Sequence, residues 1–250
     1  MKSNLLLLIF IVTMSCSNNK NKEVKNSISI SNVNPAEILF NNKKLNINKN
    51  LLLGKFDYTT DSSFTIVSAN LSSRKIYINK TVNDSFMKMA QTAKKEGVNL
   101  IVISGTRNFY EQKSIWERKW NNSNSTNNLD KAYKILEYSS MPTTSRHHWG
   151  TDIDLINLNN SYFENGKGLK EYNWLINNAN RFGFYQVYTD KSNGRTGYNM
   201  EKWHWSFKPL SEKYLNKYNK VIKYSDINGF KGFEIASKID VILKYVNGVD

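Results

Sequence analysis

The placement of the histidines constrains the fold of this chain more than any other feature. Only three histidines occur in 250 residues. His147 and His148 lie side by side in the segment SRHHWGTDID, and His204 lies in EKWHW. Each segment also holds a carboxylate, Asp154 in the first and Glu201 in the second. If the two segments serve one site, the chain must fold so that residues far apart in sequence become neighbours.

Two histidines and a carboxylate form the ligand set of a catalytic zinc site, which keeps a fourth position for water. His147, Asp154 and His204 supply this set, and Glu201 is a candidate to accept the proton of a metal-bound water. Gly150 allows the chain to turn between a loop histidine and a strand carboxylate. Taken singly, a histidine beside tryptophans is more often a core or surface residue than a ligand. The conjunction of all three histidines with Asp and Glu indicates a hydrolytic metal site.

The N-terminus has the layout of a secretory signal. A single lysine near the start precedes an apolar run that is too short for a comfortable bilayer span, and small residues follow. The segment TMSC resembles a bacterial lipobox, so we expect a lipoprotein signal peptide over residues 1–15 and a lipidated Cys16. An ordinary signal peptide that ends near a cysteine is the alternative. Residues 16–50 are rich in Asn, Lys and Ser, and we interpret them as a flexible, lipid-anchored tether.

Composition limits how the remaining chain is held together and what it binds. Cys16 is the only cysteine, so no disulfide forms and a hydrophobic core must hold the domain predicted over residues 51–250. The formal net charge of +14 invites an interpretation as a nucleic-acid-binding protein. The lysines are scattered among asparagines rather than gathered on one face, which argues against nucleic acid. Attraction to anionic phospholipid or wall polymers is the better interpretation, and a compositional bias toward Lys and Asn is the simplest one.

The hydrophobic pattern predicts helices and short strands without a regular alternation of the two. Branched residues and turn signals predict strands at 98–105, 151–158, 184–188 and 201–207. Helical spacing and end signals predict helices at 84–95, 110–120, 129–138, 168–182, 210–219 and 233–246. This order favours the α+β class, a compact single domain with a small central antiparallel sheet flanked by helices.

Three motifs occur in the chain in a recognisable order. The segment SGTRNFYEQ runs from Ser104 to Gln112, the pattern S-x-H-x-x-G-x-x-x-D begins at Ser145, and E-x-W-H begins at Glu201. Together they resemble the motifs of the VanY-type D-alanyl-D-alanine carboxypeptidases, zinc peptidases of the bacterial wall. The resemblance covers roughly residues 51–207. It implies the compact α+β fold that this family shares with lysostaphin-type peptidases and the hedgehog signalling domain.

Carried over residue by residue, the resemblance implies roles for the candidate site. It implies one zinc ion held by His147, Asp154 and His204, with Glu201 as the catalytic base. It assigns Arg107 to the substrate, near the scissile bond or at the terminal carboxylate. A guanidinium group suits either place, because it holds two oxygens at once and stays charged.

Four further positions are expected at the substrate groove. Ser145 and Gln112 match polar family positions that line it. The family commonly has a small residue at the position of Asp152. We expect Asp152 to attract a substrate ammonium, to hydrogen-bond a metal ligand from behind, or to be exposed to solvent. Trp149 forms a wall of the groove or packs in the core. His148 falls on a variable position, so we interpret it as an exposed or wall-contacting side chain and not as a ligand.

The resemblance to the VanY-type family implies a zinc peptidase that removes the terminal D-alanine from peptidoglycan stem peptides, and the TMSC segment implies that it is lipid-anchored. An L,D-carboxypeptidase acting on tetrapeptides, or an endopeptidase acting on cross-links, would use the same site. A non-catalytic zinc module that binds wall peptides is a further interpretation, although it has no need of Glu201 as a base. We expect an exported, monomeric protein at the periplasm or cell envelope, anchored to the membrane through Cys16 and without affinity for nucleic acid.

Overall fold

The structure, a computed structural model, describes residues 47–250. The predicted signal peptide at residues 1–15, the predicted lipidation site Cys16 and nearly all of the tether predicted at 16–50 lie outside the described residues. Of the helices in the described range, none is long and apolar enough to cross a membrane.

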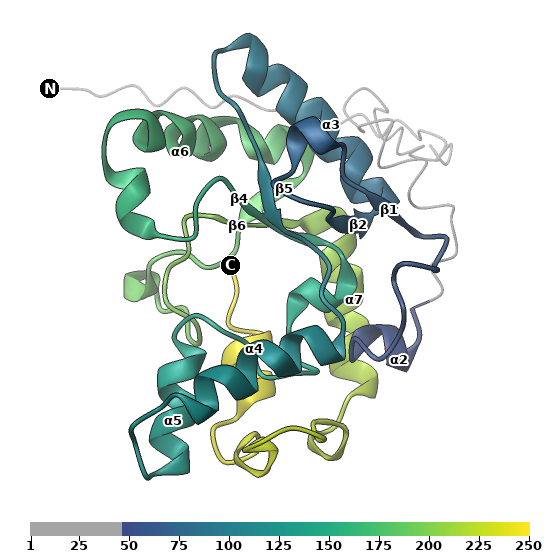
Figure 1. Ribbon diagram of the computed structural model, residues 1–250, viewed down its shortest axis with the longest axis vertical. Coiled ribbons are helices and arrows are strands. Elements are labelled where there is room, and N and C mark those ends of the chain that lie inside the picture. Colours follow the sequence, from purple (N-terminus) through teal and green to yellow (C-terminus); the bar gives the residue numbers. More distant parts are fainter. Residues whose placement is uncertain (1–46) are drawn as a thin grey trace, which may run out of the picture. The chain divides into compact units, whose positions relative to one another are not determined.

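Four short strands form an antiparallel sheet in which strands far apart in sequence are neighbours (Figure 1). The order across this sheet is β3, β4, β6, β5, with the bounds Val102–Ser104, Asp152–Leu155, His204–Phe207 and Phe184–Gln186. A separate two-stranded sheet, which the sequence did not indicate, pairs β1 with β2, Phe64–Ile66 with Tyr77–Asn79. The strands of the larger sheet all fall within predicted ranges, and the predicted α+β class is confirmed.

Helices flank these strands. Their bounds are α2 Lys49–Leu52, α3 Lys80–Lys95, α4 Phe109–Asn121, α5 Asn128–Leu136, α6 Gly166–Asn178 and α7 Lys208–Val221. α3 packs against β2 and against the turn that follows α6, whereas α4 packs against α5. In Figure 1, α3 and α6 lie above the larger sheet, and α4 and α5 lie below it. Helices therefore border the sheet on more than one side, as predicted.

The helix predicted at 84–95 begins earlier, at Lys80. Asn79 precedes it, and the Asn79 side chain accepts a hydrogen bond from the Thr81 amide at 3.0 Å. This bond satisfies one of the amide groups that a first helical turn leaves without a partner. Val82 is fully buried, so the core also holds the added turn in place.

The single helix predicted at 233–246 is wrong. A short 3₁₀ turn and a π-helical turn at Ile242–Val246 replace it. Between them, Asp240 adopts a left-handed conformation with a φ of 52°. Ile239 and Val241 are both fully buried, but positions two apart on a helix face different sides. The chain departs from helical geometry here, and this lets both side chains enter the core.

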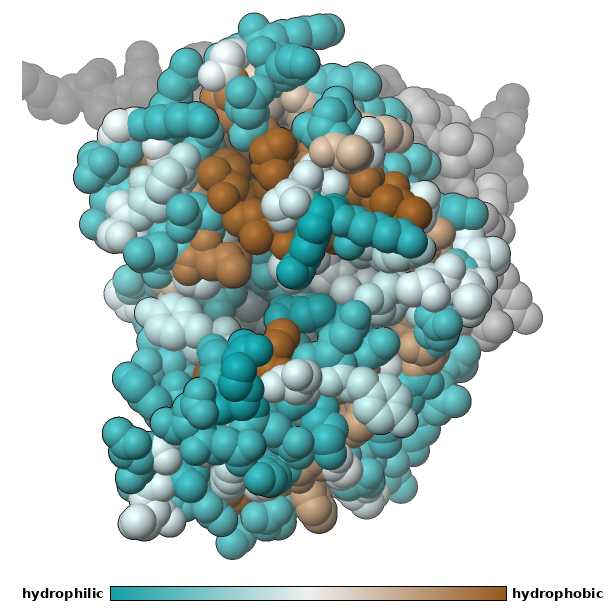
Figure 2. Space-filling view, in the orientation of Figure 1, coloured by the Kyte–Doolittle hydropathy of each residue, from teal (hydrophilic) through white to brown (hydrophobic). Residues whose placement is uncertain are grey.

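Packing holds the elements that carry the site. Every residue of β4 and β6 is buried, so the centre of the larger sheet is covered on both faces. A hydrophobic cluster joins α4, α5 and the C-terminal turns, and Trp116 in it donates to the Lys231 carbonyl oxygen at 2.8 Å. Figure 2 shows a face that is hollowed across its middle, between an upper part where apolar residues gather and a mostly hydrophilic lower part.

Candidate metal centre and active site

A short 3₁₀ turn positions His147. The turn spans Arg146–Trp149 and ends at Gly150, whose φ of 67° lies in the left-handed region. A Cβ atom at Gly150 would lie 2.4 Å from the Phe64 ring, so a larger residue does not fit. His147 Nδ1 donates to the Gly105 carbonyl oxygen at 2.8 Å, which leaves the lone pair of Nε2 free for a metal ion.

The antiparallel register places the other two predicted ligands side by side. Asp154 in β4 pairs directly with His204 in β6. Asp154 Oδ1 lies 3.1 Å from His204 Nδ1, and Asp154 Oδ2 lies 3.4 Å from His147 Nε2. One ligand atom from each of these three residues lies within 4.8 Å of the others, and all three residues are buried. The predicted ligand cluster is therefore present in the fold.

Hydrogen bonds outside the cluster orient both imidazole rings. His204 Nε2 donates to Asp152 Oδ1 at 3.0 Å, so His204 Nδ1 faces Asp154. Burial alone would lower the pKa of His204, but the hydrogen bonds to the two carboxylates raise it to about 9. Each histidine presents one nitrogen to the cluster and ties the other to an oxygen, as metal-ligating histidines do. Two nitrogens and a carboxylate oxygen fit a zinc ion with an open position.

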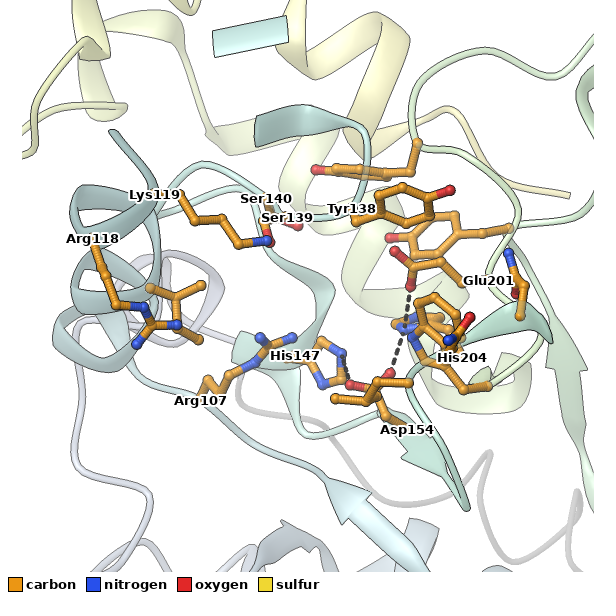
Figure 3. Close-up of a pocket in the computed structure, with 17 residues that line it drawn as sticks. Arg107, Arg118, Lys119, Tyr138, Ser139, Ser140, His147, Asp154, Glu201 and His204 are labelled. Carbon is orange, nitrogen blue, oxygen red and sulfur yellow. Dashed lines mark hydrogen bonds and ion pairs between the residues drawn. The ribbon is translucent and has the colours of Figure 1, made fainter. Parts of the chain in front are cut away.

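Glu201 lies beside the cluster, on the turn that leads into β6. Its backbone amide donates to the Tyr188 carbonyl oxygen at 2.9 Å, and its carbonyl oxygen accepts from the His204 amide at 3.3 Å. Its Oε2 lies 3.8 Å from His204 Nδ1, so the carboxylate faces the same point as the ligand atoms (Figure 3). Burial raises the pKa of Glu201 to about 8, although the charge of His204 acts in the opposite direction. A divalent cation held by the neighbouring cluster would lower this pKa again and favour the carboxylate that a base requires.

Asp152 lies beneath the cluster and not in the groove. Its Oδ1 accepts from His204 Nε2 and from Arg146 Nε, each at 3.0 Å. Arg146 also donates to Ser206 Oγ at 2.7 Å. Asp152 has no accessible surface, so it cannot contact a substrate as an exposed carboxylate would. Of the three predicted placements for Asp152, the structure supports the one behind a metal ligand.

The other three residues predicted for the groove are also buried within the protein. Gln112 Nε2 donates to the Ser140 carbonyl oxygen at 2.8 Å. Trp149 is fully buried, and its ring lies 6.0 Å from that of Tyr214. Ser145 is 1% exposed. The pocket formed by the described residues is lined by other side chains, so these three support the site from behind instead of forming its wall.

His148 is a buried structural residue, which corrects its interpretation as an exposed one. Its Nδ1 donates to the Arg107 carbonyl oxygen at 2.7 Å, and its Nε2 accepts from the Thr143 amide at 3.1 Å. Burial lowers the pKa of His148 to about 3, so the ring is neutral. Neither nitrogen is free, which agrees with its exclusion from the ligand set. Its contact with the backbone helps to fix Arg107.

The ligand cluster opens into a pocket of about 530 Å³ (Figure 3). Arg107 lines this pocket from the loop after β3, and its amide donates to the His147 carbonyl oxygen at 3.1 Å. Arg107 Nε is buried and has no hydrogen-bond partner within residues 47–250. The predicted substrate residue Arg107 thus reaches the same pocket as the predicted ligands and base.

Several residues that line the pocket are ones that sequence reasoning missed. Arg118 and Lys119 reach it from α4, together with Ile115, while Tyr138 and Tyr188 come from loops. The Tyr188 ring lies 4.5 Å from the His204 ring, so it packs directly on a ligand. Positions 115, 118 and 119 share one helical face, which is visible in the sequence. Only the fold shows that this face borders the site.

Several known proteins have sequences similar to that of this chain. The VanY family, described as D-alanyl-D-alanine carboxypeptidase, matches residues 75–210. The putative carboxypeptidase YodJ of Bacillus subtilis is 30% identical over 169 residues, which are 66% of this chain and 57% of that protein. A D-alanyl-D-alanine carboxypeptidase of Enterococcus faecium is 27% identical over 130 residues, 52% of this chain and 37% of that protein. The chain therefore spans less than two thirds of the length of either curated relative.

A solved structure with a similar fold is that of the LdcB LD-carboxypeptidase. The TM-score is 0.51 at 26% sequence identity, and the match covers 68% of this chain and 81% of that chain. The family match at residues 75–210 includes β2 to β6 and so contains Arg107, the ligand cluster and Glu201. It also extends over more than half of the chain. The chain therefore belongs to the VanY family of D-alanyl-D-alanine carboxypeptidases.

Proposed function

We propose that the protein is a zinc-dependent carboxypeptidase that removes a terminal D-alanine from peptidoglycan stem peptides. The observation that carries this proposal is the buried cluster of His147, Asp154 and His204, with Glu201 facing it and a pocket in front of it. Membership of the VanY family supports the reaction and the substrate class. A module that only binds wall peptides would have no use for a carboxylate beside the ligand cluster.

The residues of the site suit hydrolysis of a peptide bond. His147, Asp154 and His204 would hold a zinc ion, which would supply a Lewis acid for the scissile carbonyl and for a water. Glu201 accepts a proton from the attacking water and transfers it to the leaving amine as the C–N bond breaks. Arg107 has a buried Nε without a partner in the described range, so it is free to hold the oxyanion or the terminal carboxylate.

Two different bonds are candidates for the cut. The Enterococcus faecium relative is named a D-alanyl-D-alanine carboxypeptidase, which supports a D,D-carboxypeptidase that trims pentapeptides. The solved structure with a similar fold is an LD-carboxypeptidase studied for peptidoglycan recognition, which supports an L,D-carboxypeptidase that trims tetrapeptides. We propose the D,D-activity as the principal one, because the family match also carries that description.

The masses of the products separate these activities. The purified protein is incubated with a stem pentapeptide ending in D-Ala-D-Ala, with a tetrapeptide and with a cross-linked dimer, each with and without a chelator. Loss of one alanine from the pentapeptide supports the D,D-activity, and loss from the tetrapeptide alone supports the L,D-activity. Cleavage of the dimer alone identifies an endopeptidase. If a chelator-sensitive product forms from none of the three, the protein is not the proposed enzyme.

The substitution Glu201→Gln tests the base. It keeps the size of the side chain and removes the group that exchanges a proton, so turnover should fall about 100-fold or more while zinc binding persists. Glu212→Gln is the matched control, because Glu212 lies exposed on α7 and does not line the pocket. A wild-type rate in Glu201→Gln would show that another group is the base.

We propose further that the protein is an exported, monomeric lipoprotein anchored through Cys16. The apolar run, the small residues and the TMSC segment of the N-terminal sequence support the export and the lipid anchor in this proposal. Cell fractionation of the wild type and of Cys16→Ala tests it. The wild type should fractionate with membranes and the variant should be soluble, and equal distribution of the two would contradict the anchor.

A further inference from the structure

The carboxylate of Glu201 has few contacts of its own to hold it in place. Within residues 47–250, its polar contact is the ion pair with His204, in which Oε2 and Nδ1 are 3.8 Å apart. A base must lie within hydrogen-bond reach of the proton that it accepts, so a small displacement lowers its efficiency. The position of this carboxylate therefore depends on how the main chain of Glu201 is held.

The side chain of Gln186 holds this main chain from the side of β5. Its Nε2 donates to the carbonyl oxygens of Glu201 and Tyr188, each at 3.2 Å. The Glu201 amide donates to the same Tyr188 oxygen at 2.9 Å, so the three bonds close a ring. The Tyr188 side chain in turn packs on His204, with the ring centroids 4.5 Å apart. One side-chain amide thus ties the base to the residue that packs on a candidate ligand.

A second side-chain amide, that of Asn160, binds the residues on both sides of Glu201. Asn160 begins the 3₁₀ turn that ends at Glu164. Its Nδ2 donates to the Met200 carbonyl oxygen at 2.7 Å, and its Oδ1 accepts from the Lys202 amide at 3.0 Å. The main chain that carries the base is therefore bound by side chains from two different elements.

The chemistry of an amide explains why a polar side chain is buried at the end of β5. Gln186 is 9% exposed, and burying an amide without partners is costly. Both N–H groups of Nε2 are used for the two carbonyl oxygens, and Oε1 accepts from the Tyr172 hydroxyl at 2.6 Å. An apolar residue would fill this strand position without that cost. What it could not do is bind the main chain beside the base.

We propose that Gln186 and Asn160 form an amide clamp, a pair of positioning residues that hold Glu201 toward the ligand cluster. They act through the main chain of residues 200–202 and not through the Glu201 carboxylate. The inference rests on the proposed peptidase function, and it adds two residues to those that the ligand set and the base provide. Because Asn160 also lines the pocket, its effect on KM must be measured apart from its effect on kcat.

Two substitutions that keep the size of the side chain test the clamp. Gln186→Met and Asn160→Leu each replace an amide by an apolar group, so the bonds to the main chain are lost. Each should lower kcat about tenfold, because a misplacement of about 1 Å can cost up to about 100-fold. KM should stay within about threefold, since the base acts mainly in the transition state. Steady-state kinetics on the stem peptide that the wild type cleaves measures both constants.

Tyr162→Phe is the matched control. Tyr162 lies in the same 3₁₀ turn as Asn160, its hydroxyl donates to Glu171 Oε2 at 2.9 Å, and it does not line the pocket. Losing this bond should lower the melting temperature by about 2–4 °C while kcat stays within about twofold. A merely structural role predicts the same pattern for Gln186→Met, a lower melting temperature with an unchanged kcat.

Hydrogen exchange followed by NMR tests the clamp without a substrate. The Glu201 main-chain amide should exchange about tenfold faster in Gln186→Met than in the wild type, and the Lys202 amide about tenfold faster in Asn160→Leu. In the wild type, the side-chain amide protons of Gln186 should exchange at least about tenfold more slowly than those of Gln91, which is exposed on α3. This last comparison needs no variant, so it also decides the matter if a variant does not fold.

Four results would overturn the proposal. They are a wild-type kcat in both folded variants, unchanged exchange of the Glu201 and Lys202 amides, equal exchange of the Gln186 and Gln91 side chains, and an equal loss of kcat in Tyr162→Phe. The last of these would mean that activity follows general stability. Failure of the peptidase function is distinct, because the wild type would then cleave none of the stem peptides. The exchange rates would still show whether the clamp holds the main chain of Glu201.

Discussion

The substitution Asp152→Asn replaces a buried negative charge by a neutral group of nearly the same shape. Asp152 accepts hydrogen bonds from Arg146 and His204 at 3.0 Å each and has no accessible surface. The amide oxygen of an asparagine accepts bonds at the same position, so the change removes charge more than contacts. The Arg146 guanidinium group then remains buried without an opposite charge.

The structure sets the expected size of this effect. The side chains of Arg146 and Asp152 are 3% and 0% exposed, so water screens their attraction very little. Removing one partner of a buried ion pair costs about 3–5 kcal/mol of the free energy of unfolding. In a protein of this size, 1 kcal/mol shifts the melting temperature by about 2–4 °C. We therefore expect Asp152→Asn to lower the melting temperature by roughly 6–20 °C.

The same substitution should weaken the metal site. His204 donates its Nε2 proton to Asp152, and this bond orients the ring so that Nδ1 faces the cluster. Changing the partner of a ligating histidine usually lowers metal affinity about 10–100-fold. Competition with a chelating dye measures the zinc affinity, and thermal melting of the chelator-treated protein measures the stability without metal.

Two variants make the test specific. Asp84→Asn is the matched control, because Asp84 is exposed on α3, and its melting temperature should stay within about 1 °C of the wild type. Adding Arg146→Met to Asp152→Asn removes both charges, and the double variant should recover part of the lost stability. If Asp152→Asn melts like Asp84→Asn, the argument from a buried charge pair is refuted.

Three further changes test other parts of the structure. Trp149→Ala should lower the free energy of unfolding by about 3–5 kcal/mol in urea, because the ring is fully buried against Tyr214. Gly54→Ala should lower it by about 1–2 kcal/mol or more, since φ is 70° and the new Cβ would lie 2.3 Å from His148 Nδ1. Zinc at about 100 times its Kd should raise it by about 2.7 kcal/mol, and His147→Ala should abolish that gain. Unchanged urea midpoints, or a zinc effect that survives His147→Ala, would contradict these expectations.

The cluster of candidate metal ligands and Glu201 beside it were predictable because their chemistry allows few alternatives. A chain with three histidines has few ways to build a site from two of them and a carboxylate. Gly150 marked the turn before β4, and the strand pattern placed Asp154 and His204 on two different strands. The structure pairs these two residues directly. Local pattern and residue type were sufficient for this part of the site.

Burial was harder to infer from the same segments. Trp149 and His148 lie close to the candidate ligand His147 in sequence, yet both are fully buried, and His148 binds backbone groups of Arg107 and Thr143. Neighbours in a 3₁₀ turn point in different directions, so sequence adjacency to a ligand does not place a side chain in the groove. The match to the family motifs therefore assigned Ser145, Gln112 and Trp149 to the substrate groove, although their side chains are buried behind it.

The sequence by itself determined the α+β class, the strands of the larger sheet, and which residues are candidates for the metal ligands and the base, since these depend on residue chemistry and on local periodicity. Only the tertiary structure decided which side chains line the pocket. α4 illustrates the reason: Gln112 on it turns inward, while Arg118 and Lys119 line the pocket. All lie on one helix with a visible pattern, but the partner of each face is set by contacts between segments distant in sequence. Long-range packing, which no local pattern encodes, therefore determined the wall of the site.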